Sequence, residues 1–175
     1  AGVPSLKDAQ DIANPLRVPD VIGVAPEVSG SSTVSQGKKS LRVSISGVTP
    51  SYQDVRSWRA VTGNFIADAD NQERSRVAVI GSAVYAKLFD PNEYPIDQTI
   101  HINNLLFRVI GVMEEKGGGG FGNQDETVFV PLTTAQDRLF RRLDRKGNHV
   151  VGVGIVHRDL GHLGIHRLEE AVDRL

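Results

Sequence analysis

Residues 99–112 read Thr99-Ile100-His101-Ile102-Asn103-Asn104-Leu105-Leu106-Phe107-Arg108-Val109-Ile110-Gly111-Val112. Apolar and β-branched residues dominate on both sides of the pair Asn103-Asn104, which is typical of strands. Asparagine tolerates the positive φ that a two-residue hairpin turn requires. The stretch therefore predicts two antiparallel strands joined by a tight turn.

A second hairpin is predicted nearer the N-terminus. Val21 to Val28 is a strand-like run, and the segment 29–35 after it is polar and rich in hydroxyl groups. The turn residues Gln36-Gly37-Lys38-Lys39 then lead into Leu41 to Val48, where apolar and polar side chains alternate. This alternation predicts a hairpin with one apolar face.

Further strands and short helices are expected around these hairpins. The run Val77 to Ile80 predicts a strand that turns at Gly81-Ser82 into a helix, with Ser82 as its N-cap. Residues 63–76 are polar and charged enough to predict an exposed connection. The other expected elements are helices after Ser5, Thr49 and Thr133, strands over Thr127–Leu132 and Asn148–Val156, and a final amphipathic helix that Asp159 caps and whose apolar face carries Ile165, Leu168, Val172 and Leu175.

The fold class follows from this order of elements. Strands outnumber helices and hairpins dominate, so we expect an α+β domain built on antiparallel or mixed sheets. A doubly wound parallel sheet would need strands and helices in regular alternation, and no internal repeat is visible.

Composition excludes several classes of function. The 175 residues, 39% of them hydrophobic, suffice for a stable core. Twenty basic against 21 acidic residues provide no cationic excess for nucleic acid or anionic lipid. The absence of cysteine excludes disulfides, thiolate catalysis and sulfur-ligated zinc.

The longest apolar stretches, Leu105 to Met113 and Val150 to Val156, are too short to cross a bilayer. Because no signal peptide precedes Ala1, we expect a processed chain or a piece of a longer one.

The glycine run 117–122 contains the pattern G-x-G-x-x-G at Gly117, Gly119 and Gly122. A dinucleotide site needs a helix N-terminus directly behind the glycines, whereas acidic residues and a predicted strand follow here. No Lys-Ser or Lys-Thr follows either, which argues against a P-loop. The run is better interpreted as a flexible surface loop.

Other candidate chemical groups have simpler structural interpretations. Ser82 lacks the G-x-S-x-G context of a hydrolase nucleophile and an obvious histidine base. The one group of possible metal ligands comprises His157, Asp159, His162 and His166, and a solvated helical face explains it more simply. Trp58 is expected to be a packing anchor. The acidic residues of the polar connections form no acid and base pair: Asp68, Asp70, Glu73, Asp125 and Glu126.

The order of short motifs resembles the periplasmic core domain of MacB-type ABC transporter permeases (the MacB/FtsX-like permease family) nearly from end to end. Asp97, where the family typically has glycine, and the charged stretch Arg141 to Lys146 depart from the pattern. The motifs that carry the resemblance are Leu6-Lys7-Asp8-Ala9, Val21-Ile22-Gly23-Val24-Ala25-Pro26, Gly47-Val48-Thr49-Pro50-Ser51-Tyr52, Gly63-Asn64-Phe65, Val77-Ala78-Val79-Ile80-Gly81, Leu88-Phe89, Pro95-Ile96-Asp97-Gln98-Thr99-Ile100, Phe107-Arg108-Val109-Ile110-Gly111-Val112 and Val130-Pro131-Leu132-Thr133-Thr134-Ala135.

This resemblance implies two lobes: a porter-like α/β lobe from residues 1–58 and 148–175, and an inserted, mainly β lobe from 59–147. It implies a non-catalytic, extracytoplasmic domain, periplasmic or on the cell surface, between transmembrane helices of an export permease. That domain would have no cofactor and no metal, and would transmit ATP-driven movement from a separate ATPase domain or subunit. The implied partners are that ATPase, a second permease copy and a membrane-fusion adaptor, with no nucleic acid. The loop Gly117, Gly118, Gly119, Gly120, Phe121 and Gly122 is the candidate contact with a partner.

Two alternatives remain open. A freestanding secreted binding or adaptor domain could share the fold, and it would come from a parent chain without membrane spans. A hydrolase that uses Ser82 or the histidine group would react with a serine-directed probe or hold stoichiometric metal.

Overall fold

The computed structural model describes residues 24–117, 123–140, 152–159 and 162–167. For 152–159 and 162–167 it describes the backbone alone. The expected helix after Ser5 and the stretch Arg141 to Lys146 lie outside these ranges.

The first hairpin is longer than predicted. Strand β1 spans Val24–Gln36 and strand β2 spans Lys39–Val48, paired without interruption from Gln36↔Lys39 to Glu27↔Val48. Gly37, at φ +59°, occupies the first central position of the turn, where a type II′ turn requires a left-handed residue. The polar segment 29–35 is therefore strand as well, with Val34 buried between the exposed Thr33 and the half-buried Ser35.

A mixed sheet joins the described strands. Its order is β2-β7-β4-β6-β5-β1-β8-β9, with β3 paired to β6 and β2 also paired to β1. Pairs β2–β7 and β4–β6 are parallel and all the others are antiparallel, so the prediction of an antiparallel or mixed sheet is confirmed. The additional strands are β3 (Ala60–Gly63), β4 (Val77–Ile80), β5 (Thr99–Ile102), β6 (Leu105–Met113) and β7 (Thr127–Pro131).

The hairpin that decided the fold class is confirmed. Strands β5 and β6 pair from Ile102↔Leu105 to Thr99↔Arg108, and Asn103 and Asn104 both have positive φ, at 48° and 65°. Two left-handed central residues are the signature of a type I′ turn, whose twist matches that of the strands.

Short helices fill the connections. They are α2 (Tyr52–Arg56), α3 (Asp68–Glu73), α4 (Ser82–Leu88), the 3-10 turn η1 (Gln124–Glu126), α5 (Leu132–Thr134) and the π-helical turn η2 (Ala135–Leu139). Two corrections arise here. Gly81, with extended backbone, is the N-cap of α4, so Ser82 is its first helical residue. The stretch 63–76 was expected to be an exposed connection, but Phe65 and Ile66 are buried in the core. Residues 68–73 form the helix α3, which has no buried residue, so this part is exposed as expected.

Two apolar clusters pack against the sheet. The larger contains Val43, Ile45 and Val128 with α4 side chains, and the smaller contains Val48, Trp58 and Phe129. Trp58 is 1% exposed, and its ring meets that of Phe129 edge-on at 5.3 Å between centroids. The expectation that Trp58 is a packing anchor is confirmed.

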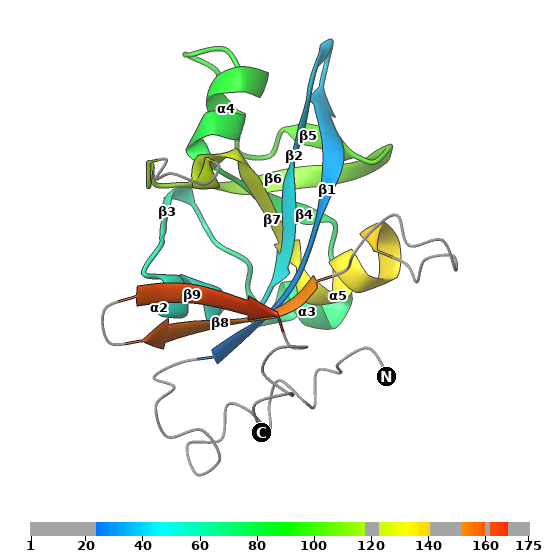
Figure 1. Cartoon of the computed structure of the whole chain (residues 1–175). Helices are drawn as coiled ribbons and strands as arrows, with labels where there is room; N and C mark the ends of the chain where they lie inside the picture. Colours follow the sequence, from blue (N-terminus) through cyan, green and yellow to red (C-terminus); the bar gives the residue numbers. More distant parts are fainter. Residues whose placement is uncertain (1–23, 118–122, 141–151, 160–161, 168–175) are drawn as a thin grey trace.

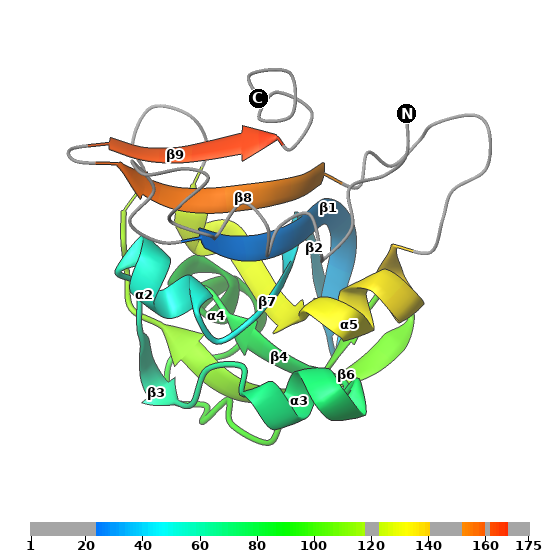
Figure 2. The same ribbon diagram turned by 90° about the horizontal axis from the view of Figure 1, so that it is seen from below.

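The predicted final helix is wrong over residues 162–167. Strand β8 (Gly152–Asp159) pairs antiparallel with β9 (His162–Arg167), and β8 also pairs with the start of β1. Figure 2 shows β9, β8 and the first part of β1 side by side. Apolar residues at Leu163 and Ile165 alternate with the period of a strand as well, and pairing with β8 selects that period.

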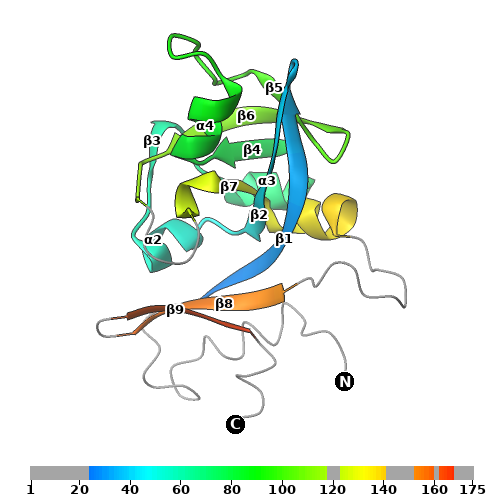
Figure 3. The same ribbon diagram turned by 45° about the horizontal axis from the view of Figure 1, so that its top comes forward.

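Strand β1 connects distant parts of the molecule. Its first half pairs with β8 and its far end pairs with β5 through Val34↔Ile102. Figures 1 and 3 show it running from the β8–β9 layer to the opposite end of the fold. In the described residues, no helix has the length and apolar character needed to span a membrane.

Candidate functional site

One buried carboxylate joins the start of the glycine run to the residues that follow it in the sequence. Asp125 is 3% exposed and accepts hydrogen bonds from the backbone N–H groups of Lys116 and Gly117, both at 2.9 Å. Its own N–H donates to the Asn123 side chain at 3.0 Å. The residues on either side of 118–122 are therefore tied together, and Gly117 begins the run in a left-handed conformation, at φ +81°.

Two cationic side chains, Lys116 and Arg56, lie next to this anchor. The Lys116 ammonium donates to the Arg56 carbonyl oxygen at 2.9 Å and lies 5.2 Å from the centre of the Trp58 ring. Arg56 is 7% exposed and donates to the Gln124 side chain at 3.1 Å. Partial burial and the neighbouring Arg56 charge lower the pKa of Lys116. Helix α2 and the 3-10 turn η1 are thereby connected.

Glu27 lies at the buried end of the polar face of the first hairpin. It is 5% exposed and accepts a hydrogen bond from the Ser46 hydroxyl at 2.7 Å. Burial raises the pKa of this carboxyl, while the Ser46 hydrogen bond and the Arg56 charge oppose the rise. Burial, reinforced by the Glu27 charge, also raises the pKa of Tyr52, whose ring lies 6.0 Å from the Arg56 guanidinium carbon. Among the described side chains, the Arg56 Nε is buried without a hydrogen-bond partner.

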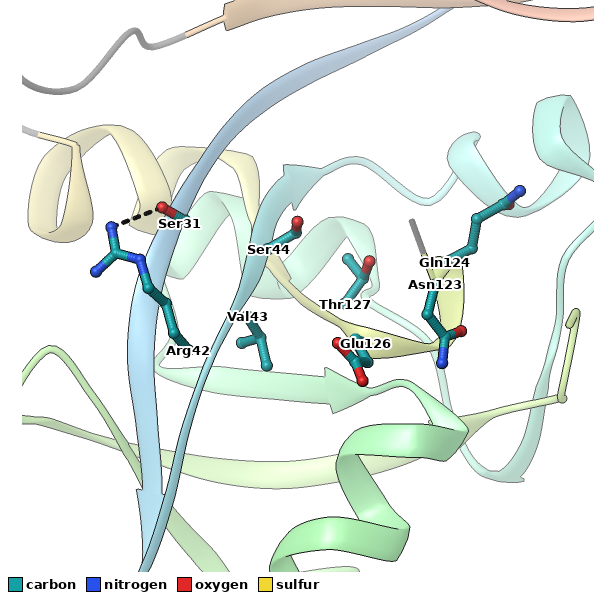
Figure 4. Close-up of a pocket in the computed structure, with 8 residues that line it drawn as sticks. All are labelled: Ser31, Arg42, Val43, Ser44, Asn123, Gln124, Glu126 and Thr127. Carbon is teal, nitrogen blue, oxygen red and sulfur yellow. Dashed lines mark hydrogen bonds between the residues drawn. The ribbon is translucent and has the colours of Figure 1, made fainter. Parts of the chain in front are cut away.

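A polar groove opens between the first hairpin and the residues around η1 (Figure 4). Its volume is about 530 Å³, and strand residues form one wall while η1 and the start of β7 form the other. The lining residues are Ser31, Arg42, Val43, Ser44, Asn123, Gln124, Glu126 and Thr127. Hydroxyl and amide groups dominate this lining, so the groove suits a ligand that makes many neutral hydrogen bonds.

Some predicted site residues lie outside the described structure. Of the candidate contact loop, Gly117 is described and exposed, whereas Gly118, Gly119, Gly120, Phe121 and Gly122 are not described. Ser82 is half-buried in the first turn of α4.

The histidine group is arranged differently from the prediction. His157 and Asp159 lie on β8 and His162 and His166 on β9, so the last two are not neighbours on a helix. In the register of this pair, Asp159 stands opposite His162 and His166 opposite Ile155. The side chains whose positions are described include no group of three possible metal ligands.

The sequence also placed Asp125 wrongly, in an exposed connection. It is buried because the two N–H groups at the start of the glycine run need an acceptor and no strand partner supplies one. The Glu27 and Arg56 cluster was missed altogether. A glutamate within an apolar strand segment, Ala25 to Val28, is the signal that could have indicated it.

Comparison with known proteins identifies the family. The model of the MacB-like periplasmic core domain matches residues 2–156. The chain belongs to this family. The macrolide export ATP-binding/permease protein MacB of Bdellovibrio bacteriovorus is 38% identical over 155 residues, which cover 89% of the chain. The pyoverdine export ATP-binding/permease protein PvdT of Pseudomonas entomophila is 31% identical over 175 residues, 99% of the chain. The matched parts are 23% and 25% of those relatives, so this MacB-like domain spans about a quarter of their length.

Solved structures share the fold of this MacB-like domain. The periplasmic region of MacB from Actinobacillus actinomycetemcomitans superimposes with a TM-score of 0.69 at 20% identity, covering 99% of this chain and 73% of that one. The extracellular domain of the noncanonic ABC-type transporter YknZ from Gram-positive bacteria gives 0.63 at 20% identity, covering 75% of this chain and 64% of that one. These matches agree with the α+β class.

Proposed function

We propose that this MacB-like domain is the extracytoplasmic part of an ABC export permease, and that it is non-catalytic. The observation that carries the proposal is the match of the periplasmic core domain over residues 2–156. In this role the domain transmits movement driven by ATP hydrolysis in a separate ATPase domain or subunit. A second permease copy and an adaptor protein are its proposed partners.

The sheet offers a route for such movement. In the proposed division, residues 1–58 and 148–175 form a porter-like lobe and 59–147 an inserted lobe. Strand β2 of the first pairs with β7 of the second over Ser44–Val48, and β1 pairs with β5. A displacement of β1 and β2 is therefore passed to the inserted lobe through backbone hydrogen bonds, since a packed sheet transmits strain.

The loop 117–122 is the proposed contact with an adaptor or substrate. Its support is the anchor at Asp125, which accepts hydrogen bonds from the N–H groups of Lys116 and Gly117, together with the apolar Phe121 that the sequence places between glycines. An anchored segment that carries one large apolar side chain suits insertion of that side chain into a pocket of a partner.

Export in cells tests this function. We expect the full-length permease, in a host without its own macrolide exporter, to raise the inhibitory concentration of a macrolide, the substrate in the name of the MacB relatives. Phe121→Ala should lose this effect while the basal ATPase rate stays unchanged. Leu106→Ala, which removes an exposed apolar side chain from β6, is the matched control and should export normally. Unchanged export by Phe121→Ala would remove the loop from the proposal.

A further inference from the structure

Half of the outer edge of β2 has no partner strand. Strand β1 pairs with β2 along its whole length, but β7 pairs with it only from Ser44↔Thr127 onward. In the described part of the chain, no strand lies against this side of residues 39–43. Strand β7 begins at Thr127, so the residues of β2 before Ser44 have no strand partner on this side in the described structure.

The hairpin register shows which backbone groups face this gap. A two-residue turn closes on a hydrogen-bonded pair, Gln36↔Lys39, and such pairs then alternate along the ladder. Ser40 and Arg42 fall at the intervening positions, so their N–H and C=O groups point away from β1. Thr33, which stands opposite Arg42, shows the same alternation. Its C=O points away from β2 and accepts a hydrogen bond from the Asn103 N–H at 3.2 Å.

The polar groove lies along this edge. Arg42 and Ser44 on β2 form one side of it, and Asn123, Gln124 and Glu126 form the other (Figure 4). Ser40, Arg42 and Ser44 are all exposed, so this side of the strand is accessible to solvent. The hydroxyl and amide lining matches the hydrogen-bonding needs of an extended polypeptide backbone.

The charged side chains around this edge indicate what kind of segment could bind there. Glu126 is paired with Lys87, and Asp90 with Lys39, so the acidic groups around the edge are already neutralised. The Arg42 guanidinium donates to the Ser31 hydroxyl at 2.9 Å and has no carboxylate partner in the described structure. An acidic side chain placed beside Arg42 would complete its hydrogen bonds.

We propose that the free edge of β2 binds an extended, acidic segment of a partner protein, which adds to the sheet as a strand in line with β7. The proposal deepens the partner contact described above and rests on it for the identity of the partner. Pairing of two copies through this edge is disfavoured because Lys38 and Arg42 of each hairpin would meet like charges.

Nuclear magnetic resonance on the chain itself tests the proposal. The probe is the capped peptide Thr-Val-Glu-Val-Thr, an extended segment with a single carboxylate. We expect it to shift the amide signals of Ser40 and Arg42 and to slow their hydrogen exchange. Arg42→Glu should weaken the affinity about fivefold, the size expected for an exposed ion pair. Ser40→Pro, which removes an outward N–H at an edge position where proline is tolerated, should abolish the protection.

Two controls separate strand addition from other binding. Lys38→Glu makes the same charge change in the turn and should bind normally. The peptide with methylated backbone nitrogens cannot pair as a strand and should not bind. The proposal would be overturned if the methylated peptide bound equally well, or if millimolar peptide caused no shift at Ser40 and Arg42. It would also be overturned if protection from hydrogen exchange were confined to β3 or to residues 117–122, or if the chain formed concentration-dependent dimers without peptide. None of these results bears on macrolide export, so failure here and failure of the proposed function remain distinguishable.

Discussion

Glu27 is a carboxyl group whose protonation is linked to folding. Burial raises its pKa in the folded protein above the ordinary value of 4.5. The folded state therefore binds the proton more tightly than the unfolded state. Stability from this group is fully present below about pH 4.5 and is lost as pH rises through the raised pKa.

Replacement of this carboxyl gives the first prediction. Glu27→Gln keeps an acceptor for the Ser46 hydroxyl and removes the charge. We expect the free energy of unfolding to be higher than in the wild type at neutral pH, with the difference shrinking toward pH 4. Urea unfolding of both proteins at neutral pH and at pH 4 measures this difference in the free energy of unfolding. A Glu27→Gln variant that is less stable than the wild type at neutral pH would show that the Arg56 charge, and not burial, dominates at this site.

Asp97 stands where the family typically has glycine. It has φ +68°, a left-handed conformation that glycine adopts without cost, and its carboxylate pairs with Arg108 at 2.9 Å across the surface. The ion pair partly offsets the backbone cost, since exposed pairs contribute at most about 1 kcal/mol.

The second prediction compares two substitutions of Asp97. Asp97→Gly loses the ion pair and gains a relaxed backbone, so its stability should stay within about 1 kcal/mol of the wild type. Asp97→Ala loses the ion pair and keeps the left-handed backbone, so it should be roughly 1 kcal/mol less stable than Asp97→Gly. Chemical unfolding of both variants checks this order. Equal stabilities would mean that the backbone conformation at position 97 carries no cost.

At the scale of elements, the connection from β6 to β7 depends on Asp125. Alanine there would leave the N–H groups of the half-buried Lys116 and the exposed Gly117 without their charged acceptor. We expect Asp125→Ala to lower stability by about 2 to 3 kcal/mol and to speed hydrogen exchange at Gly117. Asp125→Asn retains one acceptor and should lie between Asp125→Ala and the wild type. Unchanged exchange at Gly117 in Asp125→Ala would contradict the anchor.

Elements were predictable where the local signal was strong. The pair Asn103-Asn104 and the residue Gly37 define their hairpins because only certain residues adopt the required φ. Asp125 and β9 were not predictable, since both depend on partners distant in sequence. The serines of 29–35 form strand because the facing residues of β2 pair with them along the whole segment.

At the scale of the molecule, one sheet spans the two lobes proposed from the family resemblance. Strand β1 takes part in both, pairing with β8 at one end and β5 at the other. The α+β class and the family were predictable from the order of motifs. The buried cluster of Glu27 and Arg56 and the free edge of β2 were not, because they exist only once β1, β2, α2 and η1 are brought together.

We propose that this MacB-like domain lies outside the cytoplasm as part of a membrane permease, and its accessibility in cells tests that location. The chain has no cysteine of its own, so a cysteine introduced at the exposed turn residue Lys38 adds a labelling site to this domain, read against the unsubstituted full-length protein as the background control. The direct measurement is labelling of Lys38→Cys in the full-length protein with a membrane-impermeant maleimide, in cells whose inner membrane is intact. We expect labelling in intact cells and a labelled band in the membrane fraction. Labelling only after lysis, or a labelled protein in the soluble fraction, would contradict it.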